Sequence, residues 1–587
     1  MIALLTLVPL LVAILAVAAM RRHYRHVAKI AIAASFVSFI MLFFVKEGTF
    51  AMTWFSVGGY SFQLISAIAP INLLLLFIVA GVGTIVMFYS NGFIRLPTEQ
   101  RRFFVEMLAF EAAMMGFAMS GNFILLFVAW EFLSLTSYLL IQFWGTRHKA
   151  ARSARKAMTT VLIGDIALLA AIAIFWNAFG TLTFSAILSS GVQASDELYA
   201  AGILLVVAIF TKSAQFPFSE WLPDAMEGPA PVSAYLHSST MVKAGVFLAV
   251  VLAPLLAKLN VLHLLVPFGI VTLVLAALNA SKEKQIKRVL AYSTVQELGI
   301  MIAAVGAGAY AAAIYLFFAQ AFYKALLFFS AGSVMNATEN EGIEDISGLK
   351  SNRLLYYSTL FGVLALGGFV PFDGFFSSVG IGSAFAANLA VYAVLSLVGM
   401  LTSFYIFRWF FSISKKSASR HIAARYEMQP KSMVYSAALM AVLTLAASVF
   451  LFYPVFPALA GLWNGIRVSW IDAAIETMLA LAGFYIGYLA FYKRRIGWNI
   501  GALRHIVYNA DGMNAFYMLA SAFVYRLSES IDMFDLYLND LFEYIGHVAS
   551  RTGEALGHIA NGNVNAYALA YALGVIVLLV IVFVMLI

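Results

Sequence analysis

The sequence lacks cysteine and contains little charge. Among its 587 residues there is no Cys, and Asp, Glu, Lys and Arg together account for only 11%. Without cysteine the chain has no disulfide, no thiolate zinc site, no cysteine-bound iron–sulfur cluster and no cysteine nucleophile. Soluble domains are about one quarter charged, so the low charge argues against a water-soluble chain. Any redox centre that works with this protein is therefore expected in a partner.

Sequence patterns that bind soluble ligands are missing as well. No glycine-rich phosphate loop precedes a helix, and neither His148 nor His237 has a set of metal-ligand partners. We therefore expect neither a metal nor a cofactor in this chain.

Apolar runs of membrane-spanning length are abundant instead. Hydrophobic residues make up 63% of the chain, and one spanning helix needs about 20 consecutive apolar residues. The runs of this length are 2–20, 27–45, 69–91, 103–120, 123–143, 157–179, 199–216, 233–256, 260–279, 286–307, 309–335, 354–385, 388–412, 432–453, 470–492 and 564–587. We predict an all-α polytopic membrane protein with about 16 spans, in which the first run is retained because it has no clear cleavage site.

The basic residues predict the orientation of these spans. Clusters of Lys and Arg occur at 21–26, 95–102, 145–156, 281–288, 349–353, 415–426 and 493–495. With sixteen spans they fall in alternate loops, as cytoplasmic loops do, so the N-terminus should face outward. The formal net charge of +8 then mostly reflects topology, and a nucleic-acid partner is not expected.

The segment 514–560 has a different pattern. Its apolar residues advance mostly by three or four, as on one stripe of a helix, and acidic residues lie between them. We predict a long lateral amphipathic helix that packs along protein neighbours, because a helix lying on lipid usually has a basic polar face. A final anchoring helix should follow it.

Several ionisable residues lie inside predicted spans, where an unpaired charge costs at least ~3 kcal/mol. They are Lys212, Lys243, Lys324, Arg408, Glu106, Glu111, Glu131, Asp165 and Asp373. A buried Lys beside a carboxylate is a group whose protonation changes when one partner moves. Taken singly, each residue could instead belong to a structural ion pair; as a set they indicate an ion path.

Two of the spans contain helix-breaking residues. Pro217 follows Lys212 closely, and the segment 367–378 combines glycines with Pro371 and Asp373. Interrupted helices at corresponding places in two halves are typical of transport sites. We predict two inverted five-helix repeats, spans 4–8 and 9–13, with helices 7 and 12 broken.

Four segments together resemble a known family: VAWEFLSLTSYLLIQF (128–143), KSAQFPFSEWLPDAMEGPAPVSAYLHSSTMVKAGVFL (212–248), KRVLAYSTVQELG (287–299) and AFYKALLFFSAGSV (321–334). They are similar to the antiporter-like subunits of respiratory complex I and to Mrp-type cation/proton antiporter subunits. The lateral helix and last anchor resemble the distal L-type subunit, chain five. The resemblance runs over the whole chain and is densest at 120–350.

The resemblance implies roles for individual residues. Glu131 and Lys212 match the pair that switches during proton transfer, and Asp165 matches an acid that faces the neighbouring subunit. His237 matches a polar relay with Lys243 near it. Lys324 matches the central lysine of the second half-channel.

The chain also departs from the family pattern. Leu316 and Gln320 stand where two histidines are usual, and Ser378 stands where an exit lysine is usual. Neither leucine nor serine carries a proton near neutral pH. Asp373, reached from Lys324 through water, or Glu297 could substitute; a helix-end role for Glu297 is an equal alternative.

Three functions are consistent with these features. The first is a proton-translocating subunit of a redox-driven pump, such as NADH- or F420H2-dependent quinone reduction or a membrane-bound hydrogenase. Iron–sulfur clusters and a flavin or nickel–iron centre would then reside in partner subunits, and this chain would perform no redox chemistry. The second is an Mrp-type sodium/proton antiporter subunit, and the third is a non-pumping clamp of the membrane arm. The expected location is a prokaryotic cytoplasmic membrane.

The same features divide the chain into parts. The predicted parts are an N-terminal three-helix segment (1–100), a first half-channel (101–257), a second half-channel (258–413), spans 14 and 15 with a linker (414–513), the lateral helix (514–562) and the anchor (563–587).

Overall fold

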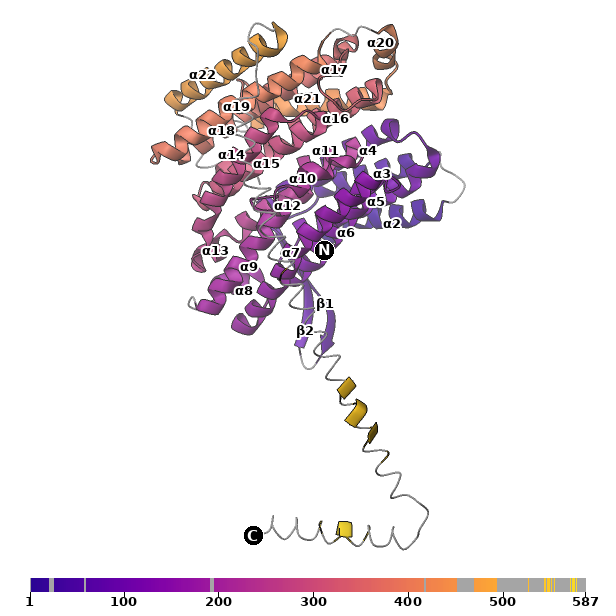
Figure 1. Cartoon of the computed structure of the whole chain (residues 1–587), viewed down its shortest axis with the longest axis vertical. Coiled ribbons are helices and arrows are strands. Elements are labelled where there is room, and N and C mark those ends of the chain that lie inside the picture. The colour runs from indigo at the N-terminus through magenta and orange to yellow at the C-terminus, as the bar shows by residue number, and fades with distance from the viewer. Residues whose placement is uncertain are drawn as a thin grey trace. The chain divides into compact units, whose positions relative to one another are not determined.

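The described part of the chain is a bundle of helices. The computed structural model describes residues 2–20, 26–57, 60–190, 195–415, 419–450 and 469–493, with scattered residues after 525. By its internal contacts the chain divides into two units, residues 1–503 and 504–587. Nearly all described elements belong to the first unit (Figure 1). The predicted lateral helix and anchor lie outside the described residues, apart from those scattered positions, and stay predictions.

The elements follow the apolar runs of the sequence. The N-terminal elements are α1 (Ile2–Leu5), α2 (Val8–Ala19), α3 (Val27–Leu42), β1 (Gly48–Val57), β2 (Tyr60–Ile68), α4 (Pro70–Phe93), α5 (Pro97–Ala118), α6 (Phe123–Ile141), α7 (His148–Phe179), α8 (Phe184–Ser189), α9 (Asp196–Lys212), α10 (Trp221–Asp224), α11 (Ala230–Ser238), α12 (Met241–Val251) and α13 (Ala253–Lys258). The later elements are α14 (Leu265–Lys282), α15 (Ile286–Gly306), α16 (Tyr310–Thr338), α17 (Arg353–Leu366), α18 (Asp373–Ala384), α19 (Leu389–Ile413), α20 (Arg420–Glu427), α21 (Lys431–Phe450) and α22 (Trp470–Gly487).

The helical membrane architecture is confirmed. Within the described residues, 10 helices are long and apolar enough to cross a membrane, and three apolar helices are shorter. Interrupted segments such as α9 fall below that length, and the charged first turns of α5 lower its hydropathy. The chain is thus a multi-pass membrane protein, while the total of sixteen spans and the inverted repeats stay predictions.

One element was not predicted from the sequence. Strands β1 and β2 form an antiparallel hairpin between α3 and α4, paired from Gly48 with Ile68 to Val57 with Tyr60. β-Branched and aromatic residues favour strands, and both strands are rich in them. The hairpin also reaches the bundle, because the Ala67 N–H donates to the Met119 carbonyl.

The predicted helix breaks are present. α9 ends at Lys212 and regular helix resumes only at Trp221, while α17 ends at Leu366 and α18 begins at Asp373. Pro217 cannot donate a backbone hydrogen bond, which explains the first interruption. At the second, a Cβ on Gly374 would lie 1.9 Å from the Ala365 carbonyl oxygen, so the close approach of α17 and α18 requires glycine there.

A third break was missed. α11 ends at Ser238 and α12 starts at Met241. The hydroxyls of Ser238 and Thr240 donate to the backbone carbonyls of Ala234 and Tyr235. Such side-chain bonds compete with the helical ladder, and the run of three hydroxyl residues was the signal for it.

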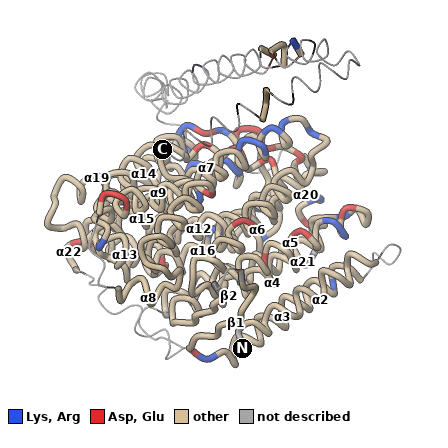
Figure 2. The backbone as a smooth tube through the Cα atoms, turned by 90° about the horizontal axis from the view of Figure 1, so that it is seen from below, with Lys and Arg blue, Asp and Glu red and all other residues tan. Residues whose placement is uncertain are grey.

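Charged residues gather at one edge of the bundle, near α5, α7 and α20 (Figure 2). In the LPDAMEGP segment at this edge, the Asp224 carboxylate lies 2.6 Å from Lys156 Nζ and 2.8 Å from Arg288 Nη1. Burial raises the pKa of Asp224, but the hydrogen bonds and charges of Lys156 and Arg288 outweigh this effect and hold it below its usual value. The cluster ties α7 and α15 to the segment after the first helix break.

Replacing Asp224 by Asn should therefore lower stability by about 1 kcal/mol at neutral pH, a modest value because the pairs are partly exposed. Because the folded pKa lies below the unfolded one, this contribution is complete above the unfolded pKa and disappears as the pH falls through the folded pKa. Thermal unfolding of the purified protein in detergent should show a weaker acid dependence for D224N than for the wild type. The control E344Q removes an exposed pair with Lys284 and should leave the acid dependence unchanged, and an unchanged dependence in D224N would contradict the assignment.

Candidate proton-transfer site

The first buried charged cluster surrounds Lys212, the last residue of α9. Its ammonium is fully buried. It donates to the Ser134 hydroxyl at 2.6 Å and to the Trp130 carbonyl at 3.2 Å, and it lies 4.4 Å from the centre of the Trp130 ring. Asp165 Oδ1 is 3.6 Å away. The interruption after Lys212 thus ends the helix where its ammonium meets α6 and α7.

Asp165 is the direct acidic partner of Lys212. Its carboxylate accepts hydrogen bonds from Trp130 Nε1 at 2.6 Å and from the Ser134 hydroxyl at 2.8 Å. Only 1% of Asp165 is exposed. Within the chain it thus contacts α6 and α9, and the resemblance-based expectation that this acid faces a neighbouring subunit stays a prediction.

Glu131 takes a different place from the one expected. It is half-buried and makes no ion pair with Lys212 in the part of the chain that the structure describes, although it experiences the charges of both Asp165 and Lys212. Trp130 and Ser134 are four residues apart and share one helix face, whereas Glu131 is turned about 100° away. In this structure the direct partner of Lys212 is thus Asp165, and the role of Glu131 in a pair that switches during proton transfer stays a prediction.

The second cluster surrounds Lys324 on α16. Its ammonium is fully buried and lies 2.7 Å from Glu297 Oε2 of α15 and 2.6 Å from the Ser293 hydroxyl. Glu297 also accepts hydrogen bonds from the Tyr323 hydroxyl at 2.5 Å and from Gln320 Nε2 at 3.0 Å. Glu297 is therefore a partner of the central lysine, and the helix-end alternative is wrong because it lies inside α15.

Lys243 and His237 come from the interrupted segment of α11 and α12. Lys243 is fully buried, donates to the Phe317 carbonyl of α16, and experiences the charges of Glu297 and Lys324. His237 is 1% exposed, and its Nδ1 has no hydrogen-bond partner among the described residues. Lys243 thus belongs to the surroundings of the second cluster, while the relay role of His237 stays a prediction.

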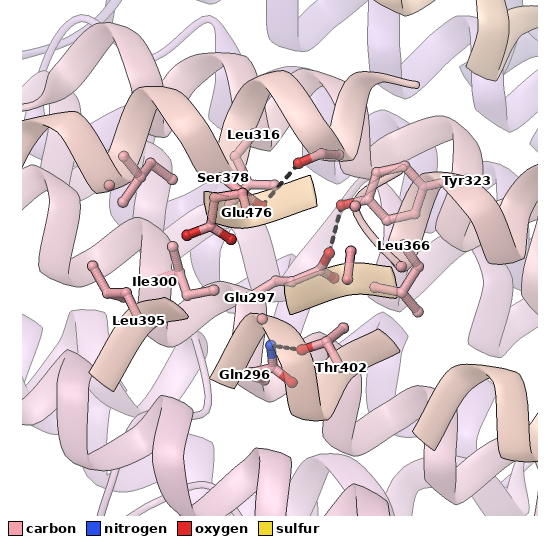
Figure 3. A pocket seen from close by; sticks show the side chains of 17 residues that line it. Gln296, Glu297, Ile300, Leu316, Tyr323, Leu366, Ser378, Leu395, Thr402 and Glu476 are labelled. Carbon is pink, nitrogen blue, oxygen red and sulfur yellow. Dashed lines mark hydrogen bonds between the residues drawn. The ribbon is translucent and has the colours of Figure 1, made fainter. Parts of the chain in front are cut away.

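Two of the three departures from the family pattern, Leu316 and Ser378, line a cavity of about 60 Å³ (Figure 3). Leu316, Ser378, Glu297 and Tyr323 all line it. A buried water needs roughly 10–15 Å³ of such space, so the cavity has room for several. Gln320 holds Glu297 in place, and the Ser378 hydroxyl donates to the Gly374 carbonyl at 2.9 Å.

Asp373 is not joined to Lys324 by a hydrogen bond between described residues. It is fully buried, one carboxylate oxygen accepts from the Gly374 N–H at 3.0 Å, and Oδ2 has no partner among the described residues. A water chain from Lys324 to Asp373 therefore stays a prediction.

Several site residues were missed in the sequence. They are Trp130, Ser134, Ser293 and the cavity-lining Glu476 of α22. Ser134 follows Trp130 by four residues, and Ser293 precedes Glu297 by four, a spacing that places side chains on one helix face. Glu476 is an acid within an apolar run and could have been found by the rule that singled out the other acids.

The two clusters share one chemical arrangement. In each, a lysine is bound by a serine hydroxyl and faces an acid inside a helix bundle that spans the membrane. In a low-dielectric interior the protonation of each group depends on its distance from the other, so a small displacement can transfer a proton. In the described residues no group of three or more His, Asp or Glu side chains could hold a metal ion.

Two protein-family models match parts of this chain. The family described as NADH:quinone oxidoreductase/Mrp antiporter, transmembrane region, matches residues 120–403. The N-terminal family of chain 5 of NADH-ubiquinone oxidoreductase (complex I) matches residues 54–104. The first match covers both lysine clusters.

Curated proteins of two kinds, quinone oxidoreductase subunits and Na(+)/H(+) antiporter subunits, are similar to this chain. NAD(P)H-quinone oxidoreductase chain 5 of Synechocystis sp. is 36% identical over 61% of this chain and 55% of the relative. A Na(+)/H(+) antiporter subunit of Alkalihalophilus pseudofirmus is 38% identical over 52% of this chain and 41% of the relative. The chain thus spans about half the length of the curated relatives it matches.

A solved structure shows the same architecture. A chain of the Mrp complex from Dietzia sp. DQ12-45-1b superimposes with a TM-score of 0.72 at 27% identity, covering 88% of this chain and 59% of that one. The fold, the two family matches and both kinds of relative agree with one another. The chain thus contains the transmembrane region that NADH:quinone oxidoreductase and Mrp antiporter subunits share, and it is similar to chain 5 of complex I and to the antiporter-like subunits of Mrp complexes.

Proposed function

We propose that this chain is a proton-translocating, antiporter-like subunit of a multisubunit, redox-driven pump. The observation that carries the proposal is the pair of fully buried lysines, each in contact with a buried acid: Lys212 with Asp165, and Lys324 with Glu297. Buried charges in a membrane protein usually belong to an ion path. The similarity to chain 5 of an NAD(P)H-quinone oxidoreductase supports the redox-driven setting.

In this function the chain moves protons and leaves electron transfer to its partners. Iron–sulfur clusters and a flavin or nickel–iron centre would belong to other subunits of the complex. The lateral segment 514–560 would contact neighbouring membrane-arm subunits. The location would be a prokaryotic cytoplasmic membrane with the N-terminus outside, in keeping with the alternating basic loops.

A second candidate function is sodium/proton antiport in an Mrp-type complex. It is favoured by the match of 88% of the chain to a chain of an Mrp complex and by the similarity to the Na(+)/H(+) antiporter subunit of Alkalihalophilus pseudofirmus. The two candidates share the proton path and differ in what drives it: electron transfer in one, a sodium gradient in the other.

One experiment tests both candidates. Inverted membrane vesicles that carry the intact complex are supplied with its electron donor or with a sodium gradient, and lumenal acidification is followed with a pH-sensitive dye. The proposal predicts acidification that depends on electron flow, collapses with a protonophore and does not require sodium.

The outcomes separate the candidates. Acidification driven by sodium alone would support the antiporter and overturn the redox-driven proposal. If electrons flow but no proton movement depends on Lys212 and Lys324, the result would support the remaining hypothesis, a non-pumping clamp of the membrane arm.

A further inference from the structure

We propose that Glu476 on α22 is the outward proton relay of the second cluster. It would replace the charged group that is missing at Ser378. This inference rests on the proposed function, because it presupposes that protons pass through Lys324 and Glu297.

The cavity beside Glu297 extends to Glu476. Its lining includes two acids, Glu297 of α15 and Glu476 of α22, together with the uncharged polar residues Ser378, Gln296 and Thr402 and several apolar side chains (Figure 3). Polar walls and space for several waters are what a hydrogen-bonded water chain requires. Among the residues described, Asp373 does not line this cavity, so the open volume leads from Glu297 to Glu476.

Glu476 is held in place at the far side of the cavity. It is 8% exposed, and its Oε1 accepts a hydrogen bond from the Ser396 hydroxyl of α19 at 2.8 Å. Its other oxygen, Oε2, lies beside Gly399: a Cβ added at that glycine would be only 3.2 Å from Oε2. The glycine therefore leaves room beside the carboxylate at the cavity wall.

A route from Glu476 toward the end of α22 follows the same pair of helices. Asp472 precedes Glu476 by one helical turn, is partly exposed, and accepts from the Tyr392 hydroxyl of α19 at 3.0 Å. Tyr392 and Ser396 are likewise one turn apart, so two hydroxyl–carboxylate pairs are stacked along α19 and α22. Trp470, the first residue of α22, is 87% exposed, which places Asp472 next to the exposed end of this helix.

The relay step is a simple proton exchange. A protonated Glu297 gives its proton to a cavity water, and the water chain delivers a proton to the Glu476 carboxylate. Glu297 is left as a carboxylate beside the Lys324 ammonium, which it pairs with at 2.7 Å. Glu476 then releases its proton toward Asp472, and Glu297 is protonated again from the Lys324 ammonium. The neutral Lys324 in turn takes up the next proton that the proposed path supplies. No oxidant or reductant takes part.

The test compares variants in the intact complex by proton translocation per electron, or per sodium ion if antiport drives it, in inverted vesicles. E476Q keeps the acceptor for Ser396 but cannot carry a proton, and we expect it to lose most of the translocation that depends on the second cluster. S378L, which fills the cavity, should have the same effect. S378A, which keeps it open, should resemble the wild type, and the exposed E344Q serves as the matched Glu-to-Gln control.

A rescue variant separates a relay from a structural role. In the E476Q background, S378K returns a titratable group to the cavity and should recover translocation. The amount of assembled complex in the membrane is measured for every variant.

Two results overturn the inference. One is an E476Q complex, assembled at wild-type level, with unchanged translocation; the other is a loss in E476Q that S378K does not relieve. Lys324→Met in parallel tests the underlying function. If it abolishes translocation while E476Q does not, the relay alone fails; if neither variant matters, the proposed function fails as well.

Discussion

Lys212→Met is expected to abolish proton transfer through the first cluster and also to reduce assembly. The substitution leaves Asp165 buried without its ammonium, and breaking one side of a buried ion pair costs about 3–5 kcal/mol. The single variant therefore mixes a loss of folding with a loss of function. The measurements are the amount of complex in the membrane and proton translocation in vesicles.

The double variant Lys212→Met with Asp165→Asn separates the two effects. Asn retains the acceptor for Trp130 Nε1 but has no charge. The double variant should therefore regain most of the stability that Lys212→Met loses, and the amount of assembled complex should rise accordingly. Translocation should stay absent, because neither remaining group carries a proton. Recovery of translocation in the double variant would show that this cluster is structural only.

Glu131→Gln is the control for the identity of the acidic partner. Because Glu131 is half-buried and not paired with Lys212, its neutralisation should leave assembly near the wild-type level. If Glu131→Gln destabilises the complex as much as Asp165→Asn alone does, then the assignment of Asp165 as the direct partner is contradicted.

Glu297→Gln is expected to have the second large effect. Gln can still accept from the Tyr323 hydroxyl, but Lys324 loses the carboxylate that lies 2.7 Å from its ammonium. We expect assembly to fall, by the same 3–5 kcal/mol argument about a broken buried pair, and translocation by the assembled fraction to be lost. The amount of complex in the membrane and proton translocation in vesicles are measured as for Lys212→Met.

Tyr323→Phe is the matched control for this second prediction. It removes one hydrogen bond to Glu297 and leaves both charges in place, which costs about 1 kcal/mol. Translocation should persist. An equal loss in both variants would indicate that the geometry of the network matters and the charge pair does not.

The helical scaffold and the two charged halves could be predicted from the sequence. Apolar runs of spanning length, Pro217 and Pro371, and isolated charges within the runs are local features, and the fold places helices and breaks accordingly. The β-hairpin was missed because it lies between two apolar runs of spanning length, and the break after Ser238 was missed because three hydroxyl residues do not interrupt the apolar run around them. Apart from scattered positions, the segment after 513 lies outside the described residues, so its lateral helix remains a prediction.

The partners of the buried charges could not be predicted in the same way. Sequence spacing places Glu131 and Lys212 on different helices, and whether their side chains meet depends on the rotation of each helix about its axis. That rotation turns Trp130 and Ser134 toward Lys212 and leaves Asp165, from a third helix, as the contact. Similarly, Gln320 holds Glu297, although the sequence presents it only as a missing histidine.

By itself, the amino-acid sequence determined that this chain crosses a membrane many times, which helices are interrupted, and that lysines and acids are buried within it, because hydrophobicity, proline and charge act locally. Only the tertiary structure decided which acid pairs with which lysine, and that a cavity connects Glu297 to Glu476 on a helix outside the predicted repeats. The physical reason is that pairing and water access depend on how helices pack against each other, and contacts between residues distant in the sequence leave no pattern in it.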